Sequence, residues 1–345
     1  MKDEHTAGGD RAQTLDALEP SAGRGVDADM RPPLQNSQTV ASSSRPEYPL
    51  QRQLVSIVMP VWRPRHDWLL EATASALGQE QCSVELIVID DGCEPPVEQL
   101  LAEIKDERLR VVRIEHRGVS GARNAGLAVA RGAYLRFLDC DDVLEPRSTA
   151  RLLSLAAGAQ DVIAYGTTVA CDEELRPRST ISCRLAGDAL ADCLLGRFTV
   201  RFPSMLFPRA VVERVGEFDV ALVMCEDGDY VLRALEHAHV RGEDRVATYY
   251  RRHGSSATAD IVAGERGLQQ MIRKYFERHP EQRGTLLERR ARASVVLASA
   301  AAWGSQGRHR EYARRLAHAL MLDPAAAARE LRRRFRTTLR RRRRA

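Results

Sequence analysis

The chain has 345 residues, of which 44% are hydrophobic and 29% charged, and its 52 Lys and Arg against 47 Asp and Glu give a formal net charge of +5. This composition excludes a wholly disordered or collagen-like chain and allows one large domain or two smaller ones. Residues 329–345 hold ten Arg and one Glu, a local charge of +9, so the rest of the chain sums to −4. The basic balance therefore belongs to a tail and gives no support for a nucleic-acid partner.

Cysteine usage and hydropathy indicate the compartment. The seven cysteines form an odd set without a CxxC pair, which argues against a disulfide framework or structural zinc and favours a reducing compartment. Residues 1–10 are polar and lack the apolar stretch of a signal peptide. The most apolar late stretch, residues 294–303, is about half as long as the ~20 residues that a membrane span needs. We therefore expect a cytoplasmic chain.

Apolar runs of strand length alternate with helical patterns in the first half of the chain. Residues 1–50 come before them, lack apolar periodicity and are predicted to form a disordered leader. Strands are expected over residues 54–60, 84–89, 109–114 and 133–138, with helices over 67–77, 97–104 and 118–131. This alternation predicts an α/β fold whose mostly parallel, Rossmann-like sheet is flanked by helices on both faces.

The second half of the chain has a mixed pattern followed by a helical one. A helix is expected after Pro146, short strands near Val162 and Met205, a helix over 227–237 and a strand ending at His253. Beyond Asp260 the spacing is helical, and residues 307–324 favour a helical hairpin over half a tetratricopeptide repeat. We predict an α/β domain over 51–256 with halves 51–145 and 146–256, a helical region over 257–330 and an Arg-rich tail over 331–345.

Carboxylates gather where the expected strands end. Asp90 and Asp91 follow the second strand, and Asp139, Asp141 and Asp142 follow the fourth. Open parallel sheets bind ligands at the carboxyl ends of their strands. Three carboxylates in four residues repel one another unless a cation compensates them, and hard oxygen ligands suit Mg²⁺ or Mn²⁺. A solvated acidic turn that caps the next helix is the alternative for these residues taken alone.

Five ordered motifs carry a resemblance to a known family. They lie at residues 56–62 (SIVMPVW), 88–92 (VIDDG), 118–142 (GVSGARNAG to FLDCDD), at Glu226 and Asp227 followed by Arg233, and at residues 250–253 (YRRH). Together they resemble the core of family 2 glycosyltransferases with the A-type fold, called GT-A. The resemblance implies an inverting, divalent-metal-dependent transfer of a sugar from a nucleotide-diphospho-sugar, uridine-linked, to a hydroxyl acceptor in polysaccharide, glycolipid or glycoconjugate biosynthesis.

The resemblance also implies a donor site. It would be formed by Pro60, Trp62, Asp91, Arg123, Asn124 and Asp139. Asp91 would hydrogen-bond the base and Trp62, where the family usually has Tyr, would stack on it, although core packing is the alternative for Trp62. Asp139 would hold the ribose or the metal. Arg123 and Asn124 would meet the donor phosphate or sugar, or else fix the loop.

Metal-binding and catalytic roles follow from the same resemblance. Asp141 would be the main Mn²⁺ or Mg²⁺ ligand, together with Asp139, and His253 would join them or contact the diphosphate, with Arg251 or Arg252 neutralising phosphate charge. Asp227 would act as the general base that deprotonates the acceptor hydroxyl, and Glu226 would orient the acceptor. Carboxylates at a helix N-terminus are also favoured by the helix dipole alone, which is compatible with these roles.

Two other functions and one membrane contact complete the sequence-based hypotheses. A nucleotidyltransferase would need a Gly-rich phosphate loop after the first strand, and residues 60–64 contain none. A non-catalytic binder of polyanions or membranes would leave the aligned carboxylates unexplained. In the tail, Leu331, Phe335 and Leu339 share one helix face among arginines, which predicts peripheral contact with the anionic inner face of a membrane. A solvated, Arg-biased terminus is the alternative.

Overall fold

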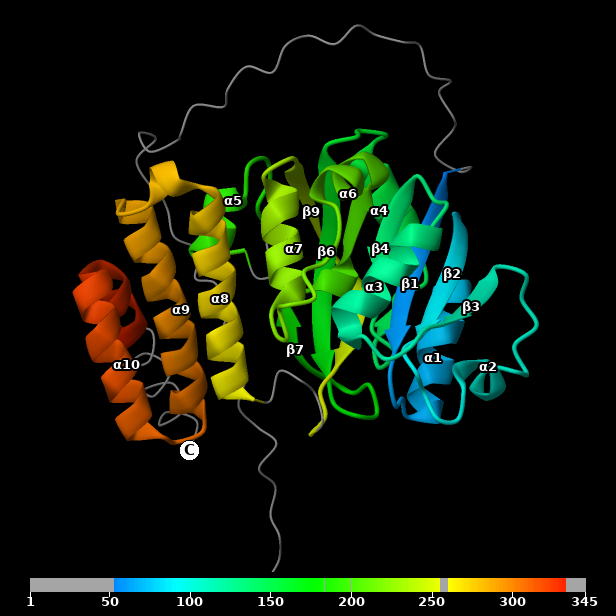
Figure 1. Cartoon of the computed structure of the whole chain (residues 1–345), viewed down its shortest axis with the longest axis horizontal. Coiled ribbons are helices and arrows are strands. Elements are labelled where there is room, and N and C mark those ends of the chain that lie inside the picture. Colours follow the sequence, from blue (N-terminus) through cyan, green and yellow to red (C-terminus); the bar gives the residue numbers. More distant parts are fainter. Residues whose placement is uncertain (1–52, 183, 199, 255–259, 333–345) are drawn as a thin grey trace, which may run out of the picture.

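The structure, a computed structural model, describes residues 53–182, 184–198, 200–254 and 260–332. The predicted leader and nearly all of the predicted Arg-rich tail lie outside these residues. Within them, helices surround a sheet, and three long C-terminal helices stand side by side at one end of the molecule (Figure 1).

Nine strands among the described residues form one sheet, in the order β3-β2-β1-β4-β8-β6-β9-β5, with β7 paired to β6. The strands are β1 (Leu54–Val61), β2 (Ser83–Asp90), β3 (Leu109–Arg113), β4 (Tyr134–Phe137), β5 (Val143–Leu144), β6 (Val162–Cys171), β7 (Pro177–Ile181), β8 (Met205–Pro208) and β9 (His239–Arg251). Parallel pairing joins β3, β2, β1 and β4, and also β6 with β9, while β8 runs antiparallel between the two groups. The predicted mostly parallel sheet is confirmed.

Helices cover both faces of the sheet because β1 alternates its side chains between two apolar clusters. The helices are α1 (His66–Leu77), α2 (Val97–Leu100), α3 (Gly118–Val129), α4 (Ser148–Ala156), α5 (Leu190–Leu194), α6 (Arg209–Val215), α7 (Glu226–Leu235), α8 (Ile261–Arg278), α9 (Leu286–Ser305) and α10 (His309–Leu322). Val55 and Ile57 pack in one cluster with α1 and α4. Val58 packs in the other with α3, α6 and α7. This is the two-residue period of a strand that is buried on both faces.

Several elements differ from the sequence prediction. The helix expected over 97–104 ends at Leu100, because the chain must turn to enter β3 at Leu109. The short strand expected near Val162 is the fully buried β6, and β7, which pairs with it in antiparallel fashion, is not predicted. The segment of β7 is polar and partly exposed, so it lacks the apolar pattern on which the prediction depends.

A close helix–strand contact fixes α3 against β1. A Cβ atom added to Gly126 would lie 2.3 Å from Cγ1 of Val58, so only glycine allows this approach. Because α3 lies on β1 in this way, its first turns run beside the carboxyl ends of β1 and β4. Arg123 is held there.

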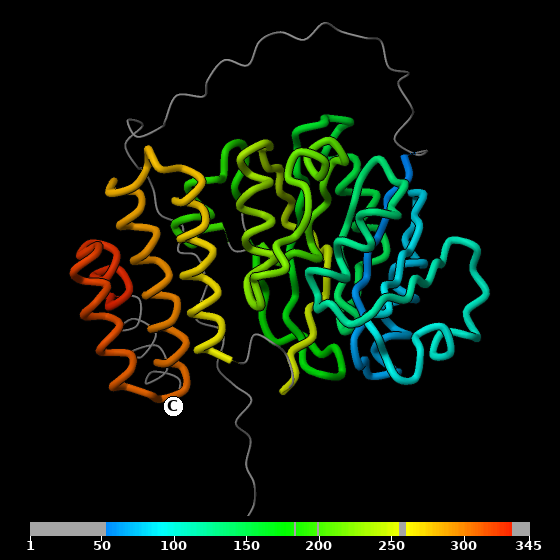
Figure 2. Tube along the Cα trace, viewed as in Figure 1, coloured from blue at the N-terminus to red at the C-terminus, as the bar shows by residue number. Residues whose placement is uncertain are grey.

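The C-terminal helices continue the structure outward from α7. Leu232 of α7, Met271 of α8 and Val295 of α9 belong to one apolar cluster. Helices α9 and α10 pack closely as a hairpin, and the trace in Figure 2 follows this order from yellow to red. The predicted helical C-terminal region is confirmed. No helix in the described part of the chain is both long and apolar enough to cross a bilayer.

A fully buried arginine joins β4 to three other parts of the chain. Arg136 donates hydrogen bonds to Pro203 O (3.0 Å), Ser148 Oγ (2.8 Å), Thr149 Oγ1 (2.8 Å), Ala247 O (3.0 Å) and Thr248 Oγ1 (3.4 Å). Because no carboxylate is among these partners, burial lowers the pKa of Arg136 to about 9. The hydrogen bonds of Arg136 therefore hold β4, α4 and β9 together.

Replacing this arginine should destabilise the fold. We expect Arg136→Met to lower the free energy of unfolding by at least about 3 kcal/mol, since each buried oxygen left without a donor costs about 1–3 kcal/mol. Urea denaturation followed by circular dichroism measures the change. In the control Arg178→Met, an exposed ion pair with Asp172 is lost, and the change should stay below about 1 kcal/mol. Equal losses in the two variants would contradict the role given to Arg136.

Candidate functional site

Most of the predicted site residues lie at one edge of the sheet, where parallel strands end. Trp62 follows β1, Asp91 follows β2 and Asp139 comes two residues after β4. After β9, His253 pairs with Asp141, and at the start of α7, Glu226 is linked to Asp139 through Arg123. Pro60 lies one residue before the end of β1 and is buried.

The side of the site near β1 and β2 contains an aromatic pair and a buried carboxylate. Trp62 is 47% exposed. Its ring stacks on His116 with centroids 4.7 Å apart, and the Arg63 guanidinium lies 4.5 Å from its centroid. Asp91 is buried and accepts a hydrogen bond from the Arg117 backbone N–H (2.7 Å), while its other oxygen lies 2.8 Å from Nδ1 of His116. His116 therefore links Trp62 to Asp91, and no sequence motif signalled it.

The acidic turn after β4 meets the end of β9. Oδ2 of Asp141 lies 2.7 Å from Nε2 of His253. Burial raises the pKa of Asp139. The positive charge of Arg123 lowers this pKa, whereas the negative charges of Asp141 and Asp227 raise it further. Asp139, Asp141 and Asp227 therefore act on one another electrostatically.

Asp142 anchors β9 and does not cap a helix. Its Oδ1 accepts the backbone N–H of Arg251 (2.9 Å), and its Oδ2 has no hydrogen-bond partner among the described residues. Burial, followed by the charges of Asp141 and Asp139, raises the pKa of Asp142 well above its usual range. The next helix, α4, begins at Ser148 without a side-chain cap, so the capping role considered from the sequence is wrong.

Aromatic and charged side chains surround His253. The ring centroids of Trp68 and His253 are 4.7 Å apart, and the Arg251 guanidinium lies 4.9 Å from the Trp68 centroid. Arg251 is buried, donates to Asp141 O (2.9 Å) and pairs with Glu71 of α1. The charge of Arg251 is thus paired with Glu71 within the protein. The contact of Trp68 with His253 was not indicated by any sequence pattern.

Arg123 connects the two carboxylate groups of the site. It is 3% exposed, and its Nη2 donates to Oδ1 of Asp139 (3.0 Å) while Nη1 donates to Oε1 of Glu226 (2.8 Å). The rings of Phe202 and Phe218 lie 5.2 and 5.5 Å from the guanidinium carbon. Burial opposes the charge of Arg123, but Asp139, Glu226 and Asp227 together raise its pKa.

The N-terminus of α7 holds the pair predicted to serve catalysis. Cys225 precedes it in a left-handed conformation with φ of 62°. Burial, and then the neighbouring charge of Asp227, raises the pKa of Glu226. Asp227 is partly buried, and its Oδ1 accepts the N–H of Gly228 (2.7 Å).

Asn124 holds the loop before α7 through both ends of its amide. It donates to Phe218 O (2.9 Å) and accepts from Phe218 N (2.7 Å). Of the two alternatives considered for Asn124, this contact corresponds to fixing a loop. The loop is the one that leads to Glu226.

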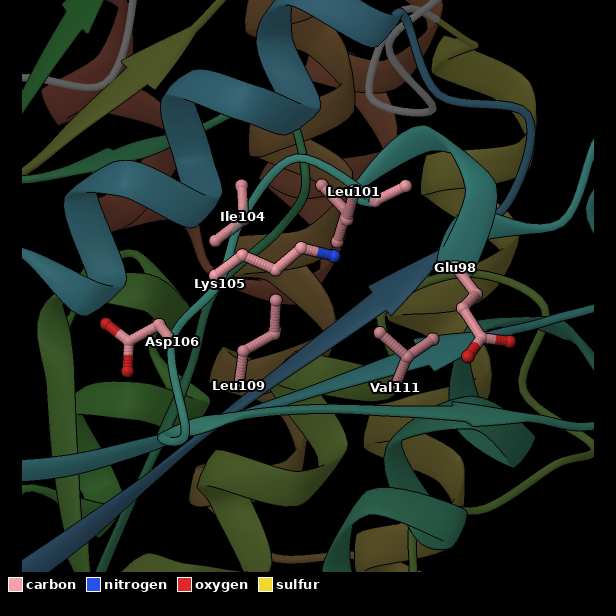
Figure 3. A pocket seen from close by; sticks show the side chains of 8 residues that line it. Glu98, Leu101, Ile104, Lys105, Asp106, Leu109 and Val111 are labelled. Carbon is pink, nitrogen blue, oxygen red and sulfur yellow. The ribbon is translucent and has the colours of Figure 1, made fainter.

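A shallow hollow elsewhere on the molecule does not coincide with this site. It lies between α2, the segment after it and β3, where Figure 3 shows Glu98 and Lys105 above Leu109 and Val111. None of its lining residues is among the predicted site residues. Among the residues that the structure describes, no group of three or more His, Cys, Asp or Glu side chains is placed to hold a metal ion.

Comparisons with known proteins agree with this geometry. The model of the family described as glycosyl transferase family 2 matches residues 56–215. The succinoglycan biosynthesis protein ExoO of Rhizobium meliloti (strain 1021) is 41% identical over 97 residues, which is 27% of this chain and 28% of that protein. The Escherichia coli protein WfaP, a UDP-Glc:alpha-D-GlcNAc-diphosphoundecaprenol beta-1,3-glucosyltransferase, is 34% identical over 91 residues, 26% of this chain and 36% of that protein. The chain thus spans only about a third or less of these relatives.

A solved structure extends the likeness to the fold. The crystal structure of Staphylococcus aureus TarS 1–349 in complex with UDP-GlcNAc superposes with a TM-score of 0.52 at 13% identity, over 76% of this chain and 90% of that chain. The superposition covers the sheet architecture and confirms the predicted GT-A fold. The family model thus assigns residues 56–215 to glycosyl transferase family 2, and the superposition shows that the fold is of the GT-A type.

Proposed function

We propose that the protein is an inverting, Mn²⁺- or Mg²⁺-dependent glycosyltransferase that moves a sugar from a UDP-sugar to a hydroxyl acceptor. The observation that carries the proposal is the arrangement across Arg123. Its guanidinium pairs with Asp139 after β4 and with Glu226 at the start of α7, so the two segments that carry Asp141 and Asp227 meet at this residue. Such a transfer needs a place for the diphosphate and a base on the opposite side of the sugar.

The donor nucleotide would bind between Trp62 and Asp91. Trp62 supplies an exposed ring for stacking, and Asp91 supplies carboxylate oxygens that retain lone pairs beyond their two protein contacts. A carboxylate acceptor complements the imide N–H of uracil. The name of the TarS complex, which contains UDP-GlcNAc, supports a uridine donor without fixing the sugar.

Asp139, Asp141 and His253 would hold the divalent cation. Oxygen ligands with one imidazole suit Mn²⁺ or Mg²⁺, ions that usually keep water and bind through one or two carboxylates plus phosphate oxygens. The contact between Asp141 and His253 and the partly exposed side chain of Asp139 fit this incomplete protein set. When bound, the cation would neutralise charge on the departing diphosphate.

Asp227 would take the proton from the acceptor hydroxyl as its oxygen attacks the anomeric carbon. Glu226 is already held by Arg123, whereas Asp227 keeps its Oδ2 available beyond the contact of Oδ1 with Gly228. One displacement with the base and the leaving group on opposite faces inverts the anomeric configuration. Glu226 and Arg123 would orient the acceptor side.

The acceptor would be a cell-surface glycan or a lipid-linked precursor assembled at the cytoplasmic face of a membrane. The names of ExoO and WfaP refer to succinoglycan biosynthesis and to a diphosphoundecaprenol acceptor, which supports this class of substrate. Residues 51–256 would form the catalytic domain, and the arginines of residues 331–345 would contact anionic lipid.

The base assignment predicts a selective loss of turnover. We expect Asp227→Asn to lower kcat for UDP release from UDP-glucose or UDP-GlcNAc by about 10²–10⁴-fold, the usual worth of a general base. The affinity for UDP, measured by calorimetry with Mn²⁺, should change less than about twofold. Asp244→Asn, which alters an exposed ion pair with Arg184, is the control and should keep full turnover. Undiminished UDP release by Asp227→Asn would reject Asp227 as the base.

The metal assignment predicts a change that can be measured without turnover. Asp141→Ala should weaken Mn²⁺ binding, followed by electron paramagnetic resonance in the presence of UDP, by at least about tenfold because one of few protein ligands is removed. Asp172→Ala, at an exposed acidic turn, should bind Mn²⁺ like the wild type. Equal Mn²⁺ affinity in all three proteins would contradict the assignment.

The membrane contact predicts that the tail carries lipid affinity. Deleting residues 332–345 should abolish cosedimentation with vesicles containing about one third phosphatidylglycerol, since each Arg near such a surface contributes about 1 kcal/mol. UDP release in solution should stay unchanged. Cosedimentation that persists after the deletion would place lipid binding elsewhere.

A further inference from the structure

Helix α8 lies outside the region matched by the family model and packs along the segment that leads into α7. Gly267 contacts Met224, Met271 lies beneath Gly228, and Lys274 pairs with Asp219. These contacts recur every three or four residues of α8, so they form one face of the helix. Helix α8 therefore supports both the loop before α7 and the first turn of α7.

The approach at Gly267 is closer than any other residue would allow. Gly267 is buried, and a Cβ atom there would lie 2.7 Å from the carbonyl oxygen of Met224 and 2.8 Å from its Cβ. The first of these atoms belongs to the backbone, so it cannot move away as the end of a flexible side chain would. The other glycine nearby in α8, Gly264, would meet nothing within 4 Å.

The supported segment is the one that carries the pair of carboxylates. Met224 is followed by Cys225 in the left-handed conformation, and then by Glu226 and Asp227. On the next residue, a Cβ atom added to Gly228 would lie 3.0 Å from Sδ of Met271. A displacement of Met224 is therefore transmitted directly to the start of α7.

The same segment is held from its other side by Arg123. Its hydrogen bond to Glu226 fixes the α7 N-terminus relative to Asp139. The start of α7 is therefore contacted both by Arg123, through Glu226, and by α8, through Gly228 and Met224.

We propose that α8 is a positioning element for the proposed general base, with Gly267 as its positioning residue and Met271 in support. The inference rests on the proposed function. It adds that the helical region sets where Asp227 stands relative to the donor, and so controls the rate of the chemical step without contributing to donor binding.

The test compares two glycines on the same helix. The wild type, Gly267→Ala and Gly264→Ala are assayed for UDP release from UDP-GlcNAc and UDP-glucose with Mn²⁺, and for UDP binding by calorimetry. We expect Gly267→Ala to lower kcat by about 10–100-fold, since a displacement of about 1 Å costs roughly 10²-fold. KM, the Kd for UDP and the number of UDP sites should stay within about twofold. Gly264→Ala should keep the kcat of the wild type.

A second pair of variants decides the question if Gly267→Ala does not fold. Met271→Ala should lower kcat at unchanged UDP affinity, whereas Leu316→Ala, which opens the packing of α9 against α10 away from α7, should lower thermal stability and leave kcat per UDP site unchanged. A kcat that is normal in both Gly267→Ala and Met271→Ala, or a loss of UDP sites parallel to the loss of kcat, overturns the inference alone. A wild type that turns over no nucleotide-sugar overturns the proposed function and this inference with it.

Discussion

The buried guanidinium of Arg123 is the interaction on which the site depends, because it pairs with carboxylates from two distant parts of the chain. Its partners Asp139 and Glu226 lie after β4 and at the start of α7. Taking a cation out of water is costly, and the nearby carboxylates offset that cost only while they stay in place. Loss of either partner would leave the buried charge of Arg123 less fully compensated. The strand-end carboxylates and the start of α7 are therefore fixed relative to each other by the same charge balance.

The charge balance around Arg123 also gives the adjacent carboxylates of Glu226 and Asp227 different surroundings. One oxygen of the largely buried Glu226 accepts a hydrogen bond from Arg123, while Asp227 accepts one from the N–H of Gly228. Both stand at the N-terminus of α7, where the exposed N–H groups of the first turn favour negative charge. Glu226 is thus held by Arg123, whereas the charge of Asp227 acts on Asp139.

Local sequence patterns predicted the features that depend on residues close together in the chain, above all the strands and their ends. The strands ending at Val61, Asp90 and Phe137 have continuous apolar runs, so the strand-end carboxylates could be placed at one edge before the structure was known. The bridge from Arg123 to Glu226 spans 103 residues and leaves no periodic signal. The same holds for the stacking of His116 on Trp62 and for the contact of Gly267 with Met224. Such contacts arise from packing between elements, which a single sequence does not encode as a pattern.

The contacts of α8 join the helical C-terminal region to the loop before α7 and to the first turn of α7. A loop such as residues 219–225 has few ways to hold a left-handed residue at Cys225, since that conformation disfavours a side chain with a Cβ atom. Asn124 fixes the start of this loop at Phe218, and Gly267 packs against its end at Met224. Cys225 directly follows the packed Met224 and directly precedes α7, so its left-handed conformation is set next to a fixed point of the chain. Two separate helices, α3 through Asn124 and α8 through Gly267, therefore contact the segment that leads to Asp227.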